Sequence, residues 1–221
     1  MLMNRILNAT KLDFYAAKST LKMTAALTII AIVIGMISHG PDYTMMFTMV
    51  FGVTASGGIF SIYERNHSEK LYGILPLKKS EMIIGRYLYA LIIGAAYIVF
   101  AAILGAVMSK VMSDNMTALT YWATLGLGFA YFSFATGIAY PIYLKFTFAK
   151  AYVFTMIPMY IIAVLFLIVT RRTDIVSNLT KVVNFFTNHV ILAPIFGLLA
   201  GLLLLTVSAL IANLIYTRKE I

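Results

Sequence analysis

The sequence predicts an all-helical membrane protein with six transmembrane helices, and two observations predict it. Of its 221 residues 62% are hydrophobic and 11% are charged, and the mean hydropathy is +0.92, whereas a soluble domain has about 45–50% apolar and about 25% charged residues. Six segments are also apolar over about 20 residues, the length that crosses a bilayer as a helix. They leave no stretch long enough for a soluble domain, so we expect a single transmembrane domain over residues 1–221.

The first 20 residues are typical of an amphipathic helix that lies in the membrane interface. Apolar and small residues recur there at steps of three and four and share one helical stripe: Met3, Leu7, Thr10, Phe14, Ala17 and Leu21. Lys11, Lys18 and Lys22 group along one edge of the stripe. We expect the stripe to lie in the acyl chains and the helix to lead into the first span. The alternative is an ordinary cytoplasmic extension of that span.

The six spans are hydrophobic all round, as helices surrounded by lipid or protein must be. We expect them at about residues 21–38, 44–63, 82–108, 118–144, 151–170 and 190–216. Residues 171–189, between the fifth and sixth spans, carry apolar residues at helical spacing. This spacing predicts an extracellular helical segment.

The distribution of Lys and Arg predicts that both termini are cytoplasmic. With the N-terminus inside, thirteen of these residues fall in inner segments and four in outer segments, and cytoplasmic loops are the ones enriched in Lys and Arg. The inner segments then carry nearly all of the net charge of +9. We expect this charge to face anionic lipid headgroups, and we expect no nucleic acid partner.

Several classes of function lack the residues they need. No charged residue lies in the central part of any span, where ion-coupled transporters place such groups. The chain has no Cys, no HExxH or paired carboxylates to hold a metal or activate water, and no GxxxxGK[ST] phosphate loop. We therefore expect that the chain is not an enzyme and has no catalytic, metal or cofactor-binding site.

The segment between the second and third spans, residues 64–81, is the densest cluster of charged residues. Ser68 can cap a short helix that Pro76 ends. That helix has three apolar residues on one side, Leu71, Ile74 and Leu75. We expect Ser80 to cap the next helix, with Glu81 in its first turn. An apolar face rimmed by charge is typical of a docking surface for another protein. The alternative is a solvated loop whose leucines dip into the headgroups.

The run from Glu64 to Leu88 also carries a family resemblance. It contains Glu69-Lys70, Leu75-Pro76-Leu77 followed by two lysines, and Gly85-Arg86-Tyr87. In this run of about two dozen residues, and in the order of its expected helices, the chain resembles ABC-2-type permease subunits, the six-span partners of ATP-binding-cassette ATPases. Within that family it is similar to small bacterial permeases that export amphipathic peptides, such as phenol-soluble modulins, or protect against antimicrobial peptides.

The resemblance implies a transport function that depends on partners. Two copies of a cytoplasmic ATPase would bind ATP and Mg, and a second permease copy or a sibling permease would complete the translocation path in the bacterial cell membrane. The segment between spans two and three would be the coupling helix in a groove of the ATPase. Its contact residues would be Glu69, Lys70, Leu71, Tyr72, Leu75, Pro76, Lys78 and Lys79.

Small and polar residues of the second and fifth spans are the candidates for the translocation path: Thr48, Gly52, Thr54, Ser56, Thr155 and Tyr160. Small residues also let helices approach closely, so helix packing is the commoner alternative. Gly197 and Gly201 form a GxxxG pattern that more often indicates packing than a dimer contact. The alternative to transport is an integral membrane immunity or scaffold protein that binds a peptide toxin without moving it.

Overall fold

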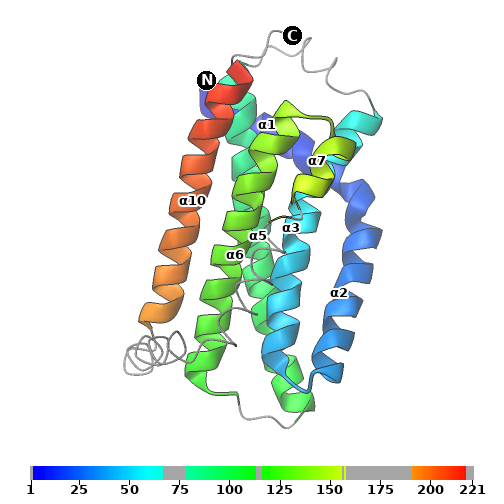
Figure 1. Cartoon of the computed structure of the whole chain (residues 1–221), viewed down its shortest axis with the longest axis vertical. Coiled ribbons are helices and arrows are strands. Elements are labelled where there is room, and N and C mark those ends of the chain that lie inside the picture. Colours follow the sequence, from blue (N-terminus) through cyan, green and yellow to red (C-terminus); the bar gives the residue numbers. More distant parts are fainter. Residues whose placement is uncertain (1, 67–77, 113–115, 156, 158–190, 218–221) are drawn as a thin grey trace.

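The computed structural model describes residues 2–66, 78–112, 116–155, 157 and 191–217. Within these residues all elements are helical and no strand occurs, which confirms the all-helical class. Most of the helices run along the long axis of the molecule (Figure 1). Their bounds are α1 (Leu2–Ala17), the 3-10 turn η1 (Lys18–Thr20), α2 (Leu21–Ile37), α3 (Pro41–Arg65), α5 (Lys79–Val111), α6 (Ala118–Lys145), α7 (Phe148–Thr155) and α10 (Leu192–Thr217).

Four of these helices are long and apolar enough to cross a membrane: α3, α5, α6 and α10. Helix α2 has 17 residues and counts as a crossing only together with α1, from which it is bent by 65°. The described residues thus contain four or five candidate spans where we expected six. Most of the expected fifth span and all of residues 171–189 lie outside the described residues.

Helix α5 begins before the residue that we expected to cap it. Its N-cap is Lys78, and Ser80 lies inside the first turn, so the prediction for Ser80 was wrong. The reason is Glu81, whose carboxylate accepts the backbone N–H of Lys78 at 2.9 Å. A Glu at the third helical position that reaches back to the N-cap stabilises the helix start there.

Helix α1 is amphipathic, but its stripe divides between two environments. Met3 and Leu7 are exposed, whereas Thr10 is buried. The buried face, which holds Ile6, Ala9, Thr10 and Asp13, packs against α5 and α3. Spacings of three and four place these residues on one side of the helix. The face that packs against α5 and α3 is therefore rotated from the predicted apolar stripe and shares only part of it. It also contains an acid, Asp13.

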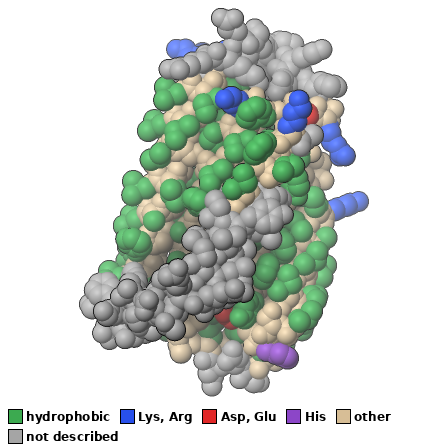
Figure 2. Space-filling view, viewed as in Figure 1, with side chains coloured by type: hydrophobic (Ala, Val, Ile, Leu, Met, Phe, Trp, Pro, Cys, Tyr) green, Lys and Arg blue, Asp and Glu red, His purple; other side chains and the backbone are tan. Residues whose placement is uncertain are grey.

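The two ends of the bundle differ in charge. The basic end, as we call it, holds α1, η1, α7, the first turns of α2 and α5 and the last turns of α3 and α6. Its basic residues are Arg5, Lys11, Lys18, Lys22, Arg65, Lys78, Lys79, Arg86, Lys145 and Lys150. Among the described residues, Lys110 is the one Lys or Arg at the opposite end. Figure 2 shows this gathering of Lys and Arg above sides that are largely apolar.

Helices α6 and α10 pack closely through glycines. A Cβ on Gly197 would lie 2.4 Å from the carbonyl oxygen of Gly126, and a Cβ on Gly201 would lie 2.8 Å from the Phe129 ring. The GxxxG pattern thus serves packing within the chain, as the commoner interpretation predicted. Ser208 of α10 also donates to the carbonyl of Gly137 at 2.6 Å.

Candidate functional site

The predicted coupling segment joins α3 to α5 at the basic end. Lys78 and Lys79 form the start of α5. The other six predicted contacts lie outside the described residues: Glu69, Lys70, Leu71, Tyr72, Leu75 and Pro76. The structure therefore describes the two points where this segment is attached, and those points carry buried polar contacts.

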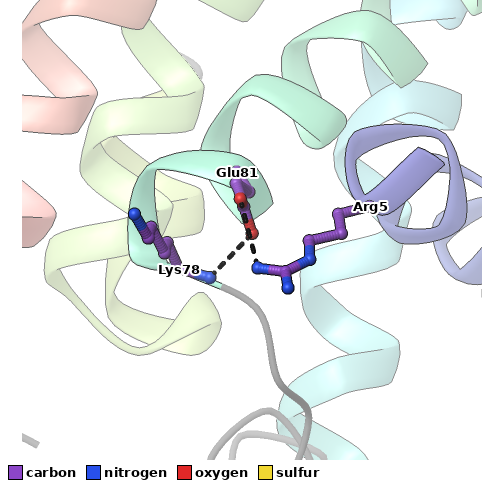
Figure 3. Close-up of polar contacts among 3 residues, drawn as sticks. All are labelled: Arg5, Lys78 and Glu81. Carbon is purple, nitrogen blue, oxygen red and sulfur yellow. Dashed lines mark hydrogen bonds and ion pairs between the residues drawn. The ribbon is translucent and has the colours of Figure 1, made fainter. Parts of the chain in front are cut away.

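Glu81 anchors the attachment to α5. It is 2% exposed and accepts the N–H of Lys78, and its Oε1 lies 3.8 Å from Nη1 of Arg5 on α1 (Figure 3). Because the Arg5 side chain is 45% exposed, we expect the ion pair to contribute little energy. The contact instead fixes the position of α1 relative to α5, since one carboxylate contacts both the start of α5 and α1.

Helix α1 lies unusually close to α5 at the next turn. A Cβ on Gly85 would lie 2.8 Å from the Cβ of Ala9, so only glycine permits this approach. The Thr10 hydroxyl lies 3.1 Å from the carbonyl oxygen of Gly85 and 3.0 Å from that of Ile6, its two acceptors. This hydrogen bond between helices holds α1 against the first turns of α5.

A buried acid and a buried base meet where α1, α3 and α5 converge. Asp13 is 1% exposed and Arg86 is 7% exposed. The Tyr63 hydroxyl donates to Oδ1 of Asp13 at 2.7 Å. Burial raises the pKa of the Asp13 carboxyl from 3.8 to about 6, although the positive charge of Arg86 and the Tyr63 hydrogen bond both act to lower it. The three side chains tie α1 to the end of α3 and the start of α5.

The last turns of α3 also contact α6 and α7. The Arg86 guanidinium carbon lies 4.9 Å from the Phe60 ring centroid, and that ring stacks on Tyr143 of α6. Tyr143 in turn stacks on Phe148 of α7, whose backbone N–H donates to the Glu64 carboxylate. We call Phe60, Tyr63 and Glu64 the α3 hub. It connects four other helices directly before the predicted coupling segment.

A cavity of about 430 Å³ lies beside the α3 hub, among η1, α2, α3, α6 and α7. Two of the predicted path residues, Thr54 and Ser56, line it. Thr48 is buried, with its hydroxyl donating to the Thr44 carbonyl at 2.7 Å. Gly52 is packed so that a Cβ would lie 2.9 Å from the Tyr97 ring.

The two remaining path candidates come from the predicted fifth span. Thr155 is the last residue of α7, and its side chain is not among those described. Tyr160 lies outside the described residues. The structure therefore brings Thr54 and Ser56 to one cavity and leaves the contribution of the fifth span as a prediction.

Sequence reasoning missed Asp13, Tyr63 and Arg86 as a group. From the sequence, Arg86 entered the family resemblance, and neither Asp13 nor Tyr63 was assigned to a site. The signal was an acid three residues after Thr10, on a helix whose other faces are apolar or basic. A buried charge needs a partner, so such an acid predicts a buried base on a neighbouring helix. Among the described residues, no three His, Asp or Glu side chains lie close enough to hold a metal ion.

The fold and its basic end define a multi-pass membrane protein, and comparison with protein families gives its family. The model described as an ABC-2 family transporter protein matches residues 10–217. The chain therefore belongs to the ABC-2 transporter family, which confirms the resemblance at the level of the family. Members of this family are the membrane components of transporters, and membership implies an ATPase partner in general. No curated protein and no solved structure matches the chain.

Proposed function

We propose that the chain is the permease subunit of an ATP-driven exporter in the bacterial cell membrane, with both termini and the basic end in the cytoplasm. The observation that carries this proposal is the family match over nearly the whole chain. The gathering of Lys and Arg at one end of the bundle supports the orientation, because cytoplasmic segments are the ones enriched in these residues.

In this proposal residues 69–79 are the coupling segment and dock in a groove of the partner ATPase. The attachments of the segment support this role. Glu64, five residues before it, contacts α7, and Glu81, two residues after it, contacts α1. A displacement of the segment on ATP binding would therefore act on α3 and α5 together, and through them on α1 and α7. Rigid-body movement of packed helices is the usual way such transitions spread.

We also propose that two permease chains, or this chain and a sibling, form the path between them, and that the substrate is an amphipathic peptide such as a phenol-soluble modulin. The peptide class rests on the resemblance to small bacterial permeases. A helical peptide of 20 residues is about 30 Å long and about 10 Å across. A cavity of about 430 Å³ in one chain cannot hold it, so a peptide substrate requires a path between chains.

The coupling segment is tested with the double variant Leu71→Asp/Leu75→Asp. We expect it to abolish co-purification with the partner ATPase, because the two acids destroy the apolar docking face. The control is Asn66→Asp/Thr147→Asp, which adds the same charge at exposed positions of the same end. Position 147 precedes α7, and Asp is a good helix cap there, as Thr is. Retained ATPase association in the Leu71/Leu75 variant would show that another surface docks the ATPase.

Transport is tested in vesicles that contain the permease and its ATPase. We expect amphipathic peptides to stimulate ATP hydrolysis and to move across the membrane with it. If no peptide stimulates hydrolysis while the complex still assembles, the peptide class is wrong and the transporter assignment stands. If a peptide binds and no ATPase associates, the immunity or scaffold alternative holds instead.

A further inference from the structure

The cavity beside the α3 hub has a buried floor and an open mouth. Residues of α3 and α6 form the floor: Ser56, Gly57, Gly58, Thr136, Ala139 and Tyr140. The exposed lining residues Ser19, Met23, Arg65 and Tyr152 come from η1, α2, α3 and α7. The mouth therefore opens at the basic end, and the floor reaches toward the middle of the bundle. Its volume of about 430 Å³ falls in the range of about 300–1,000 Å³ that small-molecule sites occupy.

The interior of the cavity suits a hydrocarbon chain. Three lining hydroxyls already bond to helix carbonyls: Thr20 donates to Ala17 at 2.8 Å, Ser56 to Val53 at 3.0 Å and Tyr140 to Ser56 at 3.1 Å. Covering a hydroxyl that already has such a partner with an apolar group costs little free energy, because no hydrogen bond is lost. The buried hydroxyl of Thr136, by contrast, has no hydrogen-bond partner among the described residues and is the one floor group that an apolar chain would cover at a cost. The wall on the α6 and α7 side consists of stacked aromatic rings, Tyr143 on Phe148 at 5.0 Å. Apolar and aromatic surface is what lines most ligand pockets.

The mouth of the cavity favours an anion. Arg65 is the one charged residue in the described lining, and no acid lies there. It is exposed at the last residue of α3, at the basic end, where the other Lys and Arg of the described chain gather. In a membrane-spanning chain this ring of bases lies at the level of the lipid headgroups. A ligand with its charge at Arg65 and its chain on the floor thus has the orientation of a membrane lipid.

We propose that this cavity binds an acyl chain of an anionic phospholipid from the leaflet at the basic end, with the lipid phosphate at Arg65. A free phosphate would leave the apolar floor unused, and a zwitterionic lipid would gain less from Arg65. The site lies within one chain and needs no ATPase, so it does not rest on the proposed transport function.

A glycine on the cavity floor, Gly58, makes the site testable. A Cβ on Gly58 would lie 3.4 Å from Cγ2 of Thr20, an ordinary contact, so Gly58→Ala fits. The larger side chain of Gly58→Leu must occupy space that the cavity now leaves open. The pair of variants at one position therefore separates a filled cavity from a changed backbone.

The experiment counts lipid bound to the purified full-length permease in detergent by native mass spectrometry. The probe is palmitoyl-oleoyl phosphatidylglycerol, with phosphatidylcholine of the same chains as the neutral comparison. We expect one saturable phosphatidylglycerol per chain, retained in Gly58→Ala and weakened at least tenfold in Gly58→Leu. Arg65→Gln should weaken phosphatidylglycerol about fivefold, as expected for one basic side chain at an anionic surface, and leave phosphatidylcholine unchanged. The matched control Lys11→Gln removes an exposed base of the same end outside the cavity and should change neither.

Equal phosphatidylglycerol binding by Gly58→Leu and the parent, or by Arg65→Gln and Lys11→Gln, would overturn the proposal. Equal affinity of the parent for the two lipids would also overturn it, because Arg65 would then not distinguish an anionic headgroup from a zwitterionic one. If Gly58→Leu does not fold, as judged by gel filtration and circular dichroism, the comparison of Arg65→Gln with Lys11→Gln decides alone.

Discussion

Asp13 and Arg86 are a buried acid and base that come from helices α1 and α5. Removing both ions from water is unfavourable, and their attraction offsets this only when further hydrogen bonds help. Here the Tyr63 hydroxyl bonds to the carboxylate, and the Phe60 and Tyr63 rings lie 4.9 Å and 5.0 Å from the guanidinium carbon. The pKa of Asp13 still stands at about 6, so burial outweighs these partners. Near neutral pH the group is ionised and is held in place by its partners.

The raised pKa of Asp13 predicts a pH-dependent stability. In the unfolded chain the carboxyl loses its proton near pH 3.8, and in the folded protein near pH 6. Between these values the folded state holds a proton that the unfolded state has lost, so the free energy of unfolding falls as pH rises. This fall is on the order of 3 kcal/mol, since one pKa unit corresponds to about 1.4 kcal/mol. Above about pH 7 the contribution is constant.

The measurement is thermal unfolding in detergent at pH 4, 5, 6 and 7 for the parent and Asp13→Asn. The variant keeps an acceptor for Tyr63 and lacks the ionisable group. We expect the stability of the parent relative to the variant to decrease from pH 4 onward and to level off toward pH 7. Parallel curves for the two proteins would contradict the assignment of the buried carboxyl.

For single residues, the sequence predicted the place of a side chain on its helix better than the distant residue that it contacts. Glu81 in a first helical turn and the exposed apolar residues Met3 and Leu7 could be read from spacing alone. The bond between Asp13 and Tyr63 could not, because it joins residues 50 positions apart. Which buried acid meets which base depends on how α1 crosses α3 and α5, and the Gly85 contact sets that crossing.

At the scale of elements, long apolar runs predicted the helices well. The expected spans at 44–63, 82–108 and 118–144 lie within α3, α5 and α6, and each helix extends beyond its span by at most about three residues. The exact start of α7 was not predicted, since it depends on the Glu64 carboxylate, a tertiary contact. The length of α2 also fell short of a full span, because the chain bends by 65° at η1.

The close packing of α6 on α10 predicts different effects for two glycines of this helix pair. In Gly197→Ala the new Cβ would lie 2.4 Å from the backbone oxygen of Gly126, whereas in Gly137→Ala it would lie 3.5 Å from the Cβ of Ser208. Both changes gain helix propensity of about 1 kcal/mol. We expect Gly197→Ala to lose about 1–3 kcal/mol to overpacking, and Gly137→Ala to be neutral or stabilising. Thermal unfolding midpoints measure both, and equal midpoints would show that α6 and α10 can move apart without loss.

For the whole molecule, the α3 hub is where contacts from one end of the bundle converge. Tyr63 contacts α1, Phe60 contacts α5 and α6, and Glu64 contacts α7. All three residues lie within the last six of α3. Helices that share one contact point must move together or break that contact, because packed interiors do not deform continuously. In the proposed transporter, the hub would carry the displacement of the coupling segment to the other helices.

Tyr63→Phe tests this transmission, because it keeps the ring beside Arg86 and removes the hydrogen bond to Asp13. The loss of a hydrogen bond to a charged group amounts to about 1.5–3 kcal/mol, which weakens the contact between α1 and α3. We expect ATPase association and hydrolysis to persist in the variant while exported peptide per ATP falls at least severalfold. The control is Tyr43→Phe, the same change at an exposed position on the opposite end of α3.

A second readout needs no substrate. Because the chain has no Cys, a spin label on Ser38→Cys reports specifically on the exposed turn at the opposite end of the bundle. In a complex with two permease chains, ATP should change the distance between the two labels, and Tyr63→Phe should reduce that change while Tyr43→Phe does not. An unchanged ATP response in Tyr63→Phe would mean that α1 does not take part in the movement. Loss of the ATPase from Tyr63→Phe would instead make the hub part of the docking surface, since a residue that only transmits movement leaves binding intact.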